Sequence, residues 1–335
     1  MKTPVWTESN WTRRRWLRSA SLGTSAAAWG LGGAVRAQEP PAEGPKPIPI
    51  EDLDEAEVVR RLRDAGLGEP RRLKSKHFLA LGDADDAFMR ASLSDCEELT
   101  LAYLRHFQTR GFEVRAPERP LFVLTFRDER SFGRFLEMPS AGRGVAQPVG
   151  IYDRSTNLLS VFDWRNVPMA SRAGSKNVQT LAHEATHQLT FNTGLLRRDA
   201  DVPIGFVEGL GTYGEPRKTL GPSDLGPLNL QRADDMAKLR RSFDWIPVRD
   251  LIADDSILRG GLFGRVLLAY AECWALVHML LHDAERTKAF RGYLEAIQAE
   301  GGAGDRLAAA GRWLGDLAAL DRDLQAYAVR VVQSL

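Results

Sequence analysis

The segment His183-Glu184-Ala185-Thr186-His187 combines two imidazoles and a carboxylate at a spacing that could hold and use a metal ion. On an α-helix, residues four apart lie one turn apart on the same face, so His183 and His187 could bind a single ion. Glu184 would lie on that side and could take a proton from a water on the ion without binding the ion itself. The chain has only six histidines, and the H-E-x-x-H pattern is expected by chance roughly 0.006 times in such a sequence.

A zinc ion in such a site needs a third protein ligand and an open fourth position for water. Glu208 is the candidate for that ligand, because it follows His187 by 21 residues, which leaves room for a turn and an antiparallel return. Asp201 and Pro203 suit the start of a second helix that would carry Glu208, although a loop is the competing interpretation. A third histidine six residues after His187 is excluded, since Thr193 occupies that position.

The helix around the histidines is predicted from an apolar stripe on another of its faces, so that it can bury one side and present the other to a cleft. Its apolar residues are Val178, Leu181, Ala185 and Leu189. Ser175 could cap the start of this helix, and the sequence Asn-Thr-Gly at 192–194 could end it. Glycines would weaken the second helix by about 0.8–1 kcal/mol each relative to alanine, which close packing against the histidine helix would justify. These glycines are Gly205, Gly209, Gly211 and Gly214.

The remaining pattern predicts an α+β fold. Strands are expected at 76–81, 121–126, 150–152 and 158–162, the last two forming a hairpin. Helices are expected at 51–65, 86–110 and 129–137, and the chain is almost wholly helical from 175 onward. A lobe with a small mixed sheet and the histidine helix, about 74–192, would pack against a mainly helical lobe, about 193–335, with a cleft between them. The basic stretch 71–76 is expected to be solvated surface.

The N-terminal segment resembles a twin-arginine export signal. It reads Thr12-Arg13-Arg14-Arg15-Trp16-Leu17-Arg18, followed by an uncharged stretch to residue 35 and by Val35-Arg36-Ala37, after which signal peptidase could cleave. We therefore expect a signal peptide over 1–37, a Pro-rich linker over 38–50 and a single domain over 51–335. The resemblance implies the twin-arginine export machinery and signal peptidase as partners, and an exported, periplasmic or extracellular location. An uncleaved anchor and a disordered basic tail are the alternatives.

The composition is that of a globular protein. The 335 residues hold 45 Lys+Arg and 44 Asp+Glu and are 44% hydrophobic, which excludes a disordered chain and a collagen. Beyond residue 37 the balance is 39 basic against 43 acidic residues, which argues against nucleic acid as a partner. We expect no stable membrane span in the mature protein. Cys96 and Cys273 are expected to be buried free thiols, with one disulfide as the alternative.

The motifs carry a family resemblance. The sequence HEATH at 183–187, followed by PIGFVEGLGTYGE at 203–215, resembles the gluzincin branch of zinc metallopeptidases, and more closely an exported family called peptidase MA-like. The run 269–278 is similar to that family's helix after the zinc site, and the similarity extends over about 74–330. It implies a zincin-like fold and one Zn²⁺ per chain, held by His183, His187 and Glu208, with Glu184 as general base.

One departure from the gluzincin pattern concerns the groups that orient the zinc ligands. Thermolysin-type enzymes carry an asparagine before the ligand glutamate and an aspartate four residues after it, whereas this chain has Val207 and Thr212. The partners of the ligand histidines are therefore not identified from the sequence.

The function implied is hydrolysis of peptide bonds in a peptide or protein substrate by a monomeric or weakly associating enzyme. A further donor is needed for the developing oxyanion; Tyr270 is the first candidate and His278 the second. Tyr213 is expected to pack in the core. A second metal site at His278 and His282 is the less favoured interpretation of their spacing. The main alternative function is a non-catalytic zinc-binding structural or binding module of the cell envelope, and a polar helix without metal is the other.

Overall fold

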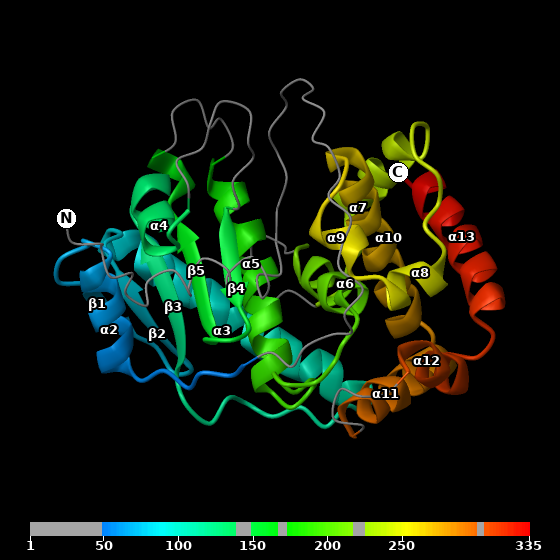
Figure 1. Cartoon of the computed structure of the whole chain (residues 1–335), viewed down its shortest axis with the longest axis horizontal. Helices are drawn as coiled ribbons and strands as arrows, with labels where there is room; N and C mark the ends of the chain where they lie inside the picture. Colours follow the sequence, from blue (N-terminus) through cyan, green and yellow to red (C-terminus); the bar gives the residue numbers. More distant parts are fainter. Residues whose placement is uncertain (1–48, 139–148, 167–172, 217–224, 300–304) are drawn as a thin grey trace, which may run out of the picture.

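A computed structural model describes residues 49–138, 149–166, 173–216, 225–299 and 305–335. The proposed signal peptide, 1–37, and nearly all of the Pro-rich linker lie outside these residues. The described chain is a mixed α+β structure, which confirms the predicted class: one five-stranded sheet lies in the N-terminal half and helices make up the C-terminal half (Figure 1).

The sheet is small and mixed, with the strand order β1-β2-β3-β5-β4. The central pairs β2–β3 and β3–β5 are parallel, whereas β1 and β4 add antiparallel edges to β2 and β5. The strands are β1 (Arg71–Lys74), β2 (Phe78–Gly82), β3 (Leu121–Phe126), β4 (Gly150–Asp153) and β5 (Leu158–Phe162). Four of them match the predicted strands. The exception is β1, where the basic stretch is exposed as expected but pairs as an edge strand that was not predicted.

Helices cover both faces of the sheet. In β2, Phe78 and Ala80 belong to the core shared with α3 and α5, whereas Leu79 and Leu81 belong to the core shared with α2 and α4. This alternation follows from the period of two along a strand. The helices of this half are α2 (Glu55–Asp64), α3 (Asp86–Thr109), α4 (Glu129–Phe135) and α5 (Ala173–Asn192), with a 3₁₀ turn, η1, at Trp164–Asn166.

Aspartates fix the starts of three of these helices. The side chains of Asp54, Asp85 and Asp128 each accept a hydrogen bond from a backbone N–H in the first turn of α2, α3 and α4. Such caps satisfy donors that would otherwise lack a partner and contribute about 1 kcal/mol each. The predicted starts of α3 and α4 agree with the observed ones, whereas α2 begins at Glu55, after the predicted start at residue 51.

The C-terminal half is built around α10, which packs against α6, α7, α11 and α13. One continuous apolar core extends from the α3 and α5 side of the sheet into this helical half. The two halves meet along α5 and α6, near the middle of Figure 1. The helices are α6 (Ile204–Gly214), α7 (Leu230–Leu239), α8 (Val248–Ala253), α9 (Ser256–Arg259), α10 (Phe263–Leu281), α11 (Ala284–Ala299), α12 (Arg306–Leu314) and α13 (Leu317–Gln333).

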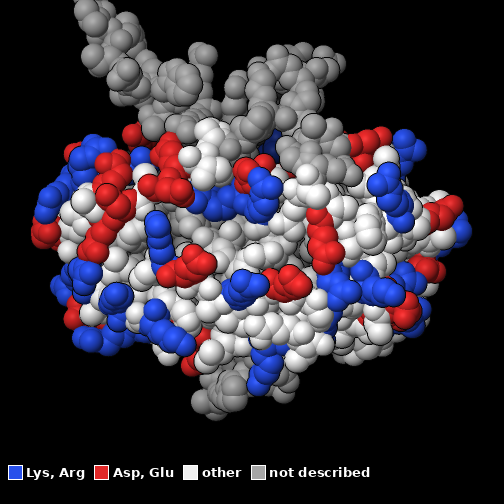
Figure 2. All heavy atoms as spheres, turned by 90° about the horizontal axis from the view of Figure 1, so that it is seen from below, with Lys and Arg blue, Asp and Glu red and all other residues white. Residues whose placement is uncertain are grey.

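By length and composition alone, helix α10 is long and apolar enough to cross a membrane. No such segment was expected from the sequence beyond residue 37, so this expectation is corrected. Most of its surface is buried inside the protein, as in the core helix of a globular fold. Cys273 on α10 and Cys96 on α3 are both buried thiols that are not joined in a disulfide, so the favoured prediction for the cysteines is confirmed. On the face shown in Figure 2, acidic and basic side chains are interspersed, in keeping with their nearly equal numbers.

Candidate metal centre

His183, His187 and Glu208 come together in the interior, and their ligand atoms lie within 4.8 Å of one another. The Nε2 atoms of the two histidines are 3.0 Å apart. Glu208 Oε2 lies 3.2 Å from His183 Nε2 and 3.4 Å from His187 Nε2. Two imidazole nitrogens and one carboxylate oxygen converging on one point form a donor set that could hold a metal ion.

Two packed helices hold these ligands. The histidines lie one turn apart on α5, which begins two residues before the predicted cap at Ser175. Glu208 lies in the middle of α6, which packs directly on α5, so the helix interpretation is confirmed over the loop. Pro203 precedes α6 as expected, but Asp201 does not cap it: Ile204 N donates to Asp255 Oδ1 at 3.0 Å.

The glycines of α6 mark the surfaces where other helices come close. A Cβ atom on Gly211 would lie 2.6 Å from His187 Cε1 and 2.9 Å from His183 Cε1. At Gly214 it would lie 1.9 Å from Thr186 Oγ1, again on α5. Gly209 meets the Cys273 carbonyl on α10 in the same way. The helix tolerates the low propensity of glycine because any side chain at these positions would separate α6 from its neighbours.

The close contact at Gly211 leads to a prediction. Gly211→Ala should lower the affinity for metal by tenfold or more, because the methyl group would displace both imidazoles from the positions that let them share one ion. Zinc affinity, measured by competition with a chromophoric chelator, checks this. Gly311→Ala is the matched control, since nothing lies within 4 Å of a Cβ on that helical glycine, and it should stabilise the fold by about 0.5–1 kcal/mol without changing affinity. Equal affinities in the two variants would contradict the prediction.

Glu184 is held by the edge strand β4. Its Oε2 accepts a hydrogen bond from Tyr152 N at 2.7 Å, whereas Oε1 has no hydrogen-bond partner among the described residues. Strand β4 can come this close to α5 because residue 150 is a glycine: a Cβ atom there would lie 2.6 Å from Thr180 Cγ2. Burial raises the pKa of Glu184. One carboxylate oxygen is therefore fixed and the other is left for a further partner.

Glu215 is the site residue that the sequence reasoning missed. Its Oε1 lies 3.0 Å from His183 Nδ1, on the side of the ring away from Glu208. Burial alone would raise the pKa of Glu215, but Arg232 and His183 outweigh it and lower the pKa to about 2. A signal was present in the sequence, because Glu215 follows Glu208 by seven residues and two helical turns return to nearly the same face.

The charges of the centre are unbalanced without a cation. Among the described residues, Glu184, Glu208 and Glu215 would carry three negative charges in the interior if all were ionised, and Arg232 supplies one positive charge. Two charges remain, which is the deficit that a divalent ion would cover. Burial lowers the pKa of His183, but its hydrogen bonds with Glu208 and Glu215 outweigh this and raise it to about 10. In the absence of an ion, a proton on His183 would supply part of the missing charge.

Tyr270 lies beside the centre, whereas His278 does not contact its ligands. The Tyr270 ring centroid is 6.4 Å from that of His183, and Arg232 Cζ lies 5.6 Å from the tyrosine ring. Burial, Glu208 and Glu184 raise the pKa of Tyr270 well above its usual value, so its hydroxyl stays a donor. The ring of His278 instead contacts the side chains of Tyr327, Trp274, Tyr213 and His282.

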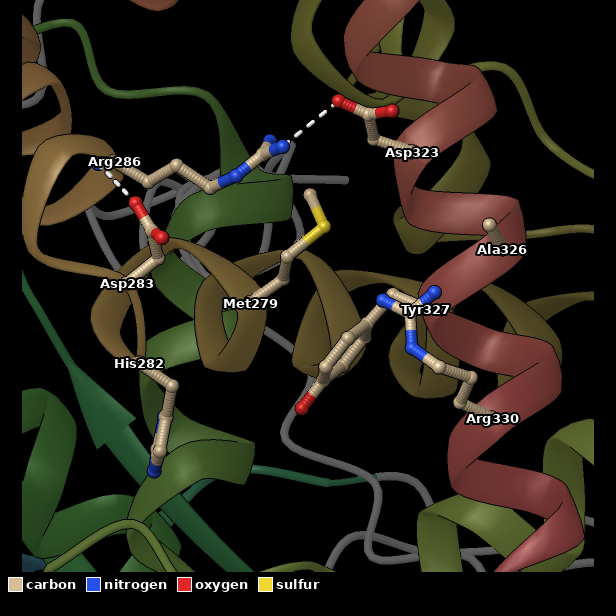
Figure 3. A pocket seen from close by; sticks show the side chains of 8 residues that line it. All are labelled: Met279, His282, Asp283, Arg286, Asp323, Ala326, Tyr327 and Arg330. Atoms are coloured by element: carbon tan, nitrogen blue, oxygen red, sulfur yellow. Dashed lines mark hydrogen bonds and ion pairs between the residues drawn. The ribbon is translucent and has the colours of Figure 1, made fainter.

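The pair His278 and His282 is not arranged as a metal site. Their rings stack in parallel with centroids 3.7 Å apart, so their nitrogens do not converge. His282 also lines a cavity of about 330 Å³ bounded by α10, α11 and α13, which contains none of the three candidate ligands (Figure 3). Tyr213 is buried and its hydroxyl lies 3.0 Å from His106 Nε2, so its predicted packing role is confirmed.

A family model described as a protein of unknown function (DUF1570) matches residues 177–300. No curated protein matches the chain. The matched stretch extends from α5 to α11 and includes the candidate ligands together with Glu184, Glu215, Arg232 and Tyr270. Over these residues, which include the three candidate ligands, the chain is similar to that family.

Proposed function

We propose that this protein is an exported, zinc-dependent peptidase of the gluzincin type, similar to the peptidase MA-like family and with a zincin-like fold. The observation that carries the proposal is the convergence of His183, His187 and Glu208, with Glu184 next to the first ligand on the same helix. Imidazole and carboxylate ligands suit zinc, and three protein ligands would leave a position open for water. The charge deficit of the centre supports a divalent cation.

The proposed reaction divides the work among the zinc ion, the side chains of Glu184 and Tyr270, and the backbone N–H of Tyr152. Bound zinc would polarise the peptide carbonyl and lower the pKa of its water towards about 7. Glu184 would accept a proton from the attacking water through Oε1 and then pass it to the leaving amine. Tyr270 would donate a hydrogen bond to the oxyanion. The hydrogen bond from Tyr152 N would keep the Glu184 carboxylate in one orientation during both transfers.

A second function is favoured by the burial of the centre. His183, Glu184, His187 and Glu208 are each at most 3% exposed, whereas a peptide substrate would have to reach the open position on the ion and the carboxylate of Glu184. The burial of these side chains favours the alternative function, a zinc-binding structural or binding module of the cell envelope. The two proposals agree on the metal and differ on hydrolysis.

The experiment that separates them is a peptide-library digest with protein purified from the exported fraction without chelator. We expect about one zinc per chain, an intact mass that begins at Gln38, and cleavage that stops when a chelator is added and returns with zinc. Zinc without cleavage of any peptide would favour the binding module, and a folded protein without zinc would contradict both. A mature protein that retains residues 1–37 would contradict the twin-arginine export and signal-peptidase steps.

A further inference from the structure

We propose that Arg232 is a positioning residue of the metal centre, which fixes Glu215 so that Glu215 orients His183 towards the ion. This inference rests on the proposed binding of metal, but it does not depend on peptide hydrolysis. It assigns the support of the ligand histidine to α7, which contributes none of the three ligands.

The geometry around His183 defines which nitrogen is available. Glu215 Oε1 is 3.0 Å from Nδ1 and Glu208 Oε2 is 3.2 Å from Nε2, so the two carboxylates lie at opposite nitrogens of the ring. An ionised carboxylate can only accept, so Nδ1 would carry the proton and donate it to Glu215. The lone pair is then on Nε2, the nitrogen that faces the ion.

Arg232 donates hydrogen bonds to both oxygens of the Glu215 carboxylate. Its Nη2 donates to Glu215 Oε1 at 2.5 Å and its Nε donates to Oε2 at 3.1 Å. Asn229 Nδ2 donates to Oε2 at 2.8 Å and also caps α7, because Asn229 Oδ1 accepts from Arg232 N. Both oxygens of Glu215 therefore have partners, and the carboxylate cannot rotate without breaking several contacts at once.

The burial of this network points to more than helix packing. Glu215 is 3% exposed and Arg232 is 4% exposed, and two buried ions gain little stability over apolar side chains of similar volume. A pair of helices could be joined more simply by apolar residues. The ion pair instead places a fixed carboxylate at the outer nitrogen of one ligand. Arg232 also lies over the ring of Tyr270, so the same guanidinium contacts both the support of the metal and the proposed oxyanion donor.

The experiment compares Arg232→Met, Arg232→Lys and Glu215→Gln in the full mature protein. Zinc affinity is measured by chelator competition, and the visible absorption spectrum is measured after loading with Co²⁺. We expect Arg232→Met and Glu215→Gln to weaken zinc binding by about 10–100-fold and to change the Co²⁺ spectrum. Arg232→Lys should recover part of the affinity, since an ammonium keeps the charge but loses the two-pronged contact. Glu215→Gln is nearly isosteric, which keeps the test valid if Arg232→Met does not fold.

Arg154→Met is the matched control. Arg154 is also buried, but it lies against Phe191 and donates to backbone carbonyls, including that of Arg198. This control should change thermal stability and leave zinc affinity and the Co²⁺ spectrum unchanged. The inference would be overturned if Arg232→Met and Glu215→Gln kept parental affinity and spectrum while losing only stability, or if Arg154→Met weakened zinc binding equally. If the parent itself binds no zinc, the proposed function fails, and this inference with it.

Discussion

Glu184→Gln is expected to keep about one zinc per chain and to lower kcat by about 10²–10⁴-fold, the usual contribution of a general base. The amide has the shape of the carboxylate and its oxygen can still accept the hydrogen bond from Tyr152 N. It cannot, however, accept a proton from water. Because Glu184 is not among the three ligands, the metal should stay. The measurement is kcat on a peptide identified in the library digest, together with zinc content by elemental analysis.

Glu272→Gln is the control for this prediction. Glu272 is fully buried on α10, and its Oε2 accepts a hydrogen bond from Ile246 N at 3.1 Å, as Glu184 does from Tyr152 N. Burial raises the pKa of Glu272 to about 8, so the amide replaces a side chain that is already mostly neutral at pH 7. Its kcat should be close to that of the parent. Hydrolysis that persists in Glu184→Gln would remove Glu184 from the mechanism, whereas loss in both variants would indicate a general sensitivity to buried amides.

The ligands could be predicted because they depend on local helical geometry. Two histidines one turn apart have one arrangement on a helix, and the length of chain to Glu208 allows a return. The strands β2 and β3 could likewise be predicted from the sequence. Their apolar side chains form continuous runs, because helices cover both faces of the sheet. In contrast, β1 has exposed basic residues and no apolar alternation, so only its pairing with β2 identifies it as a strand.

The role of Arg232 in supporting the ligands could not be predicted because it depends on a tertiary contact. Arg232 lies on a separate helix, 17 residues after Glu215, and an arginine on an amphipathic helix is usually solvated. The hydrogen bond that caps the start of α6 is likewise a tertiary contact. Asp201 was the local candidate for its cap, but Asp201 pairs with Arg306, and Asp255 accepts the N–H of Ile204 instead. Local capping patterns identify the beginning of this helix but not the side chain that satisfies it.

Glu208→Ala is expected to weaken zinc binding by more than the about 10–100-fold that loss of an outer partner costs. The change removes the only charged ligand and leaves two imidazoles, which is one ligand fewer than zinc sites with an open position use. It also removes one of the three buried carboxylates whose charges Arg232 and a dication together would balance. Zinc affinity by chelator competition should rank the parent first, Glu215→Gln next and Glu208→Ala last.

Thermal unfolding with and without zinc separates loss of the ligand from loss of the fold. An ion that binds only the folded state stabilises it by about 2.7 kcal/mol at 100 times its Kd. The parent should therefore gain stability with zinc, whereas Glu208→Ala should unfold at one temperature whether zinc is present or not. If Glu208→Ala kept the zinc-dependent gain, the carboxylate would be a neighbour of the histidines and not a ligand. The two imidazoles would then require a different third donor, and the proposed gluzincin arrangement would be wrong.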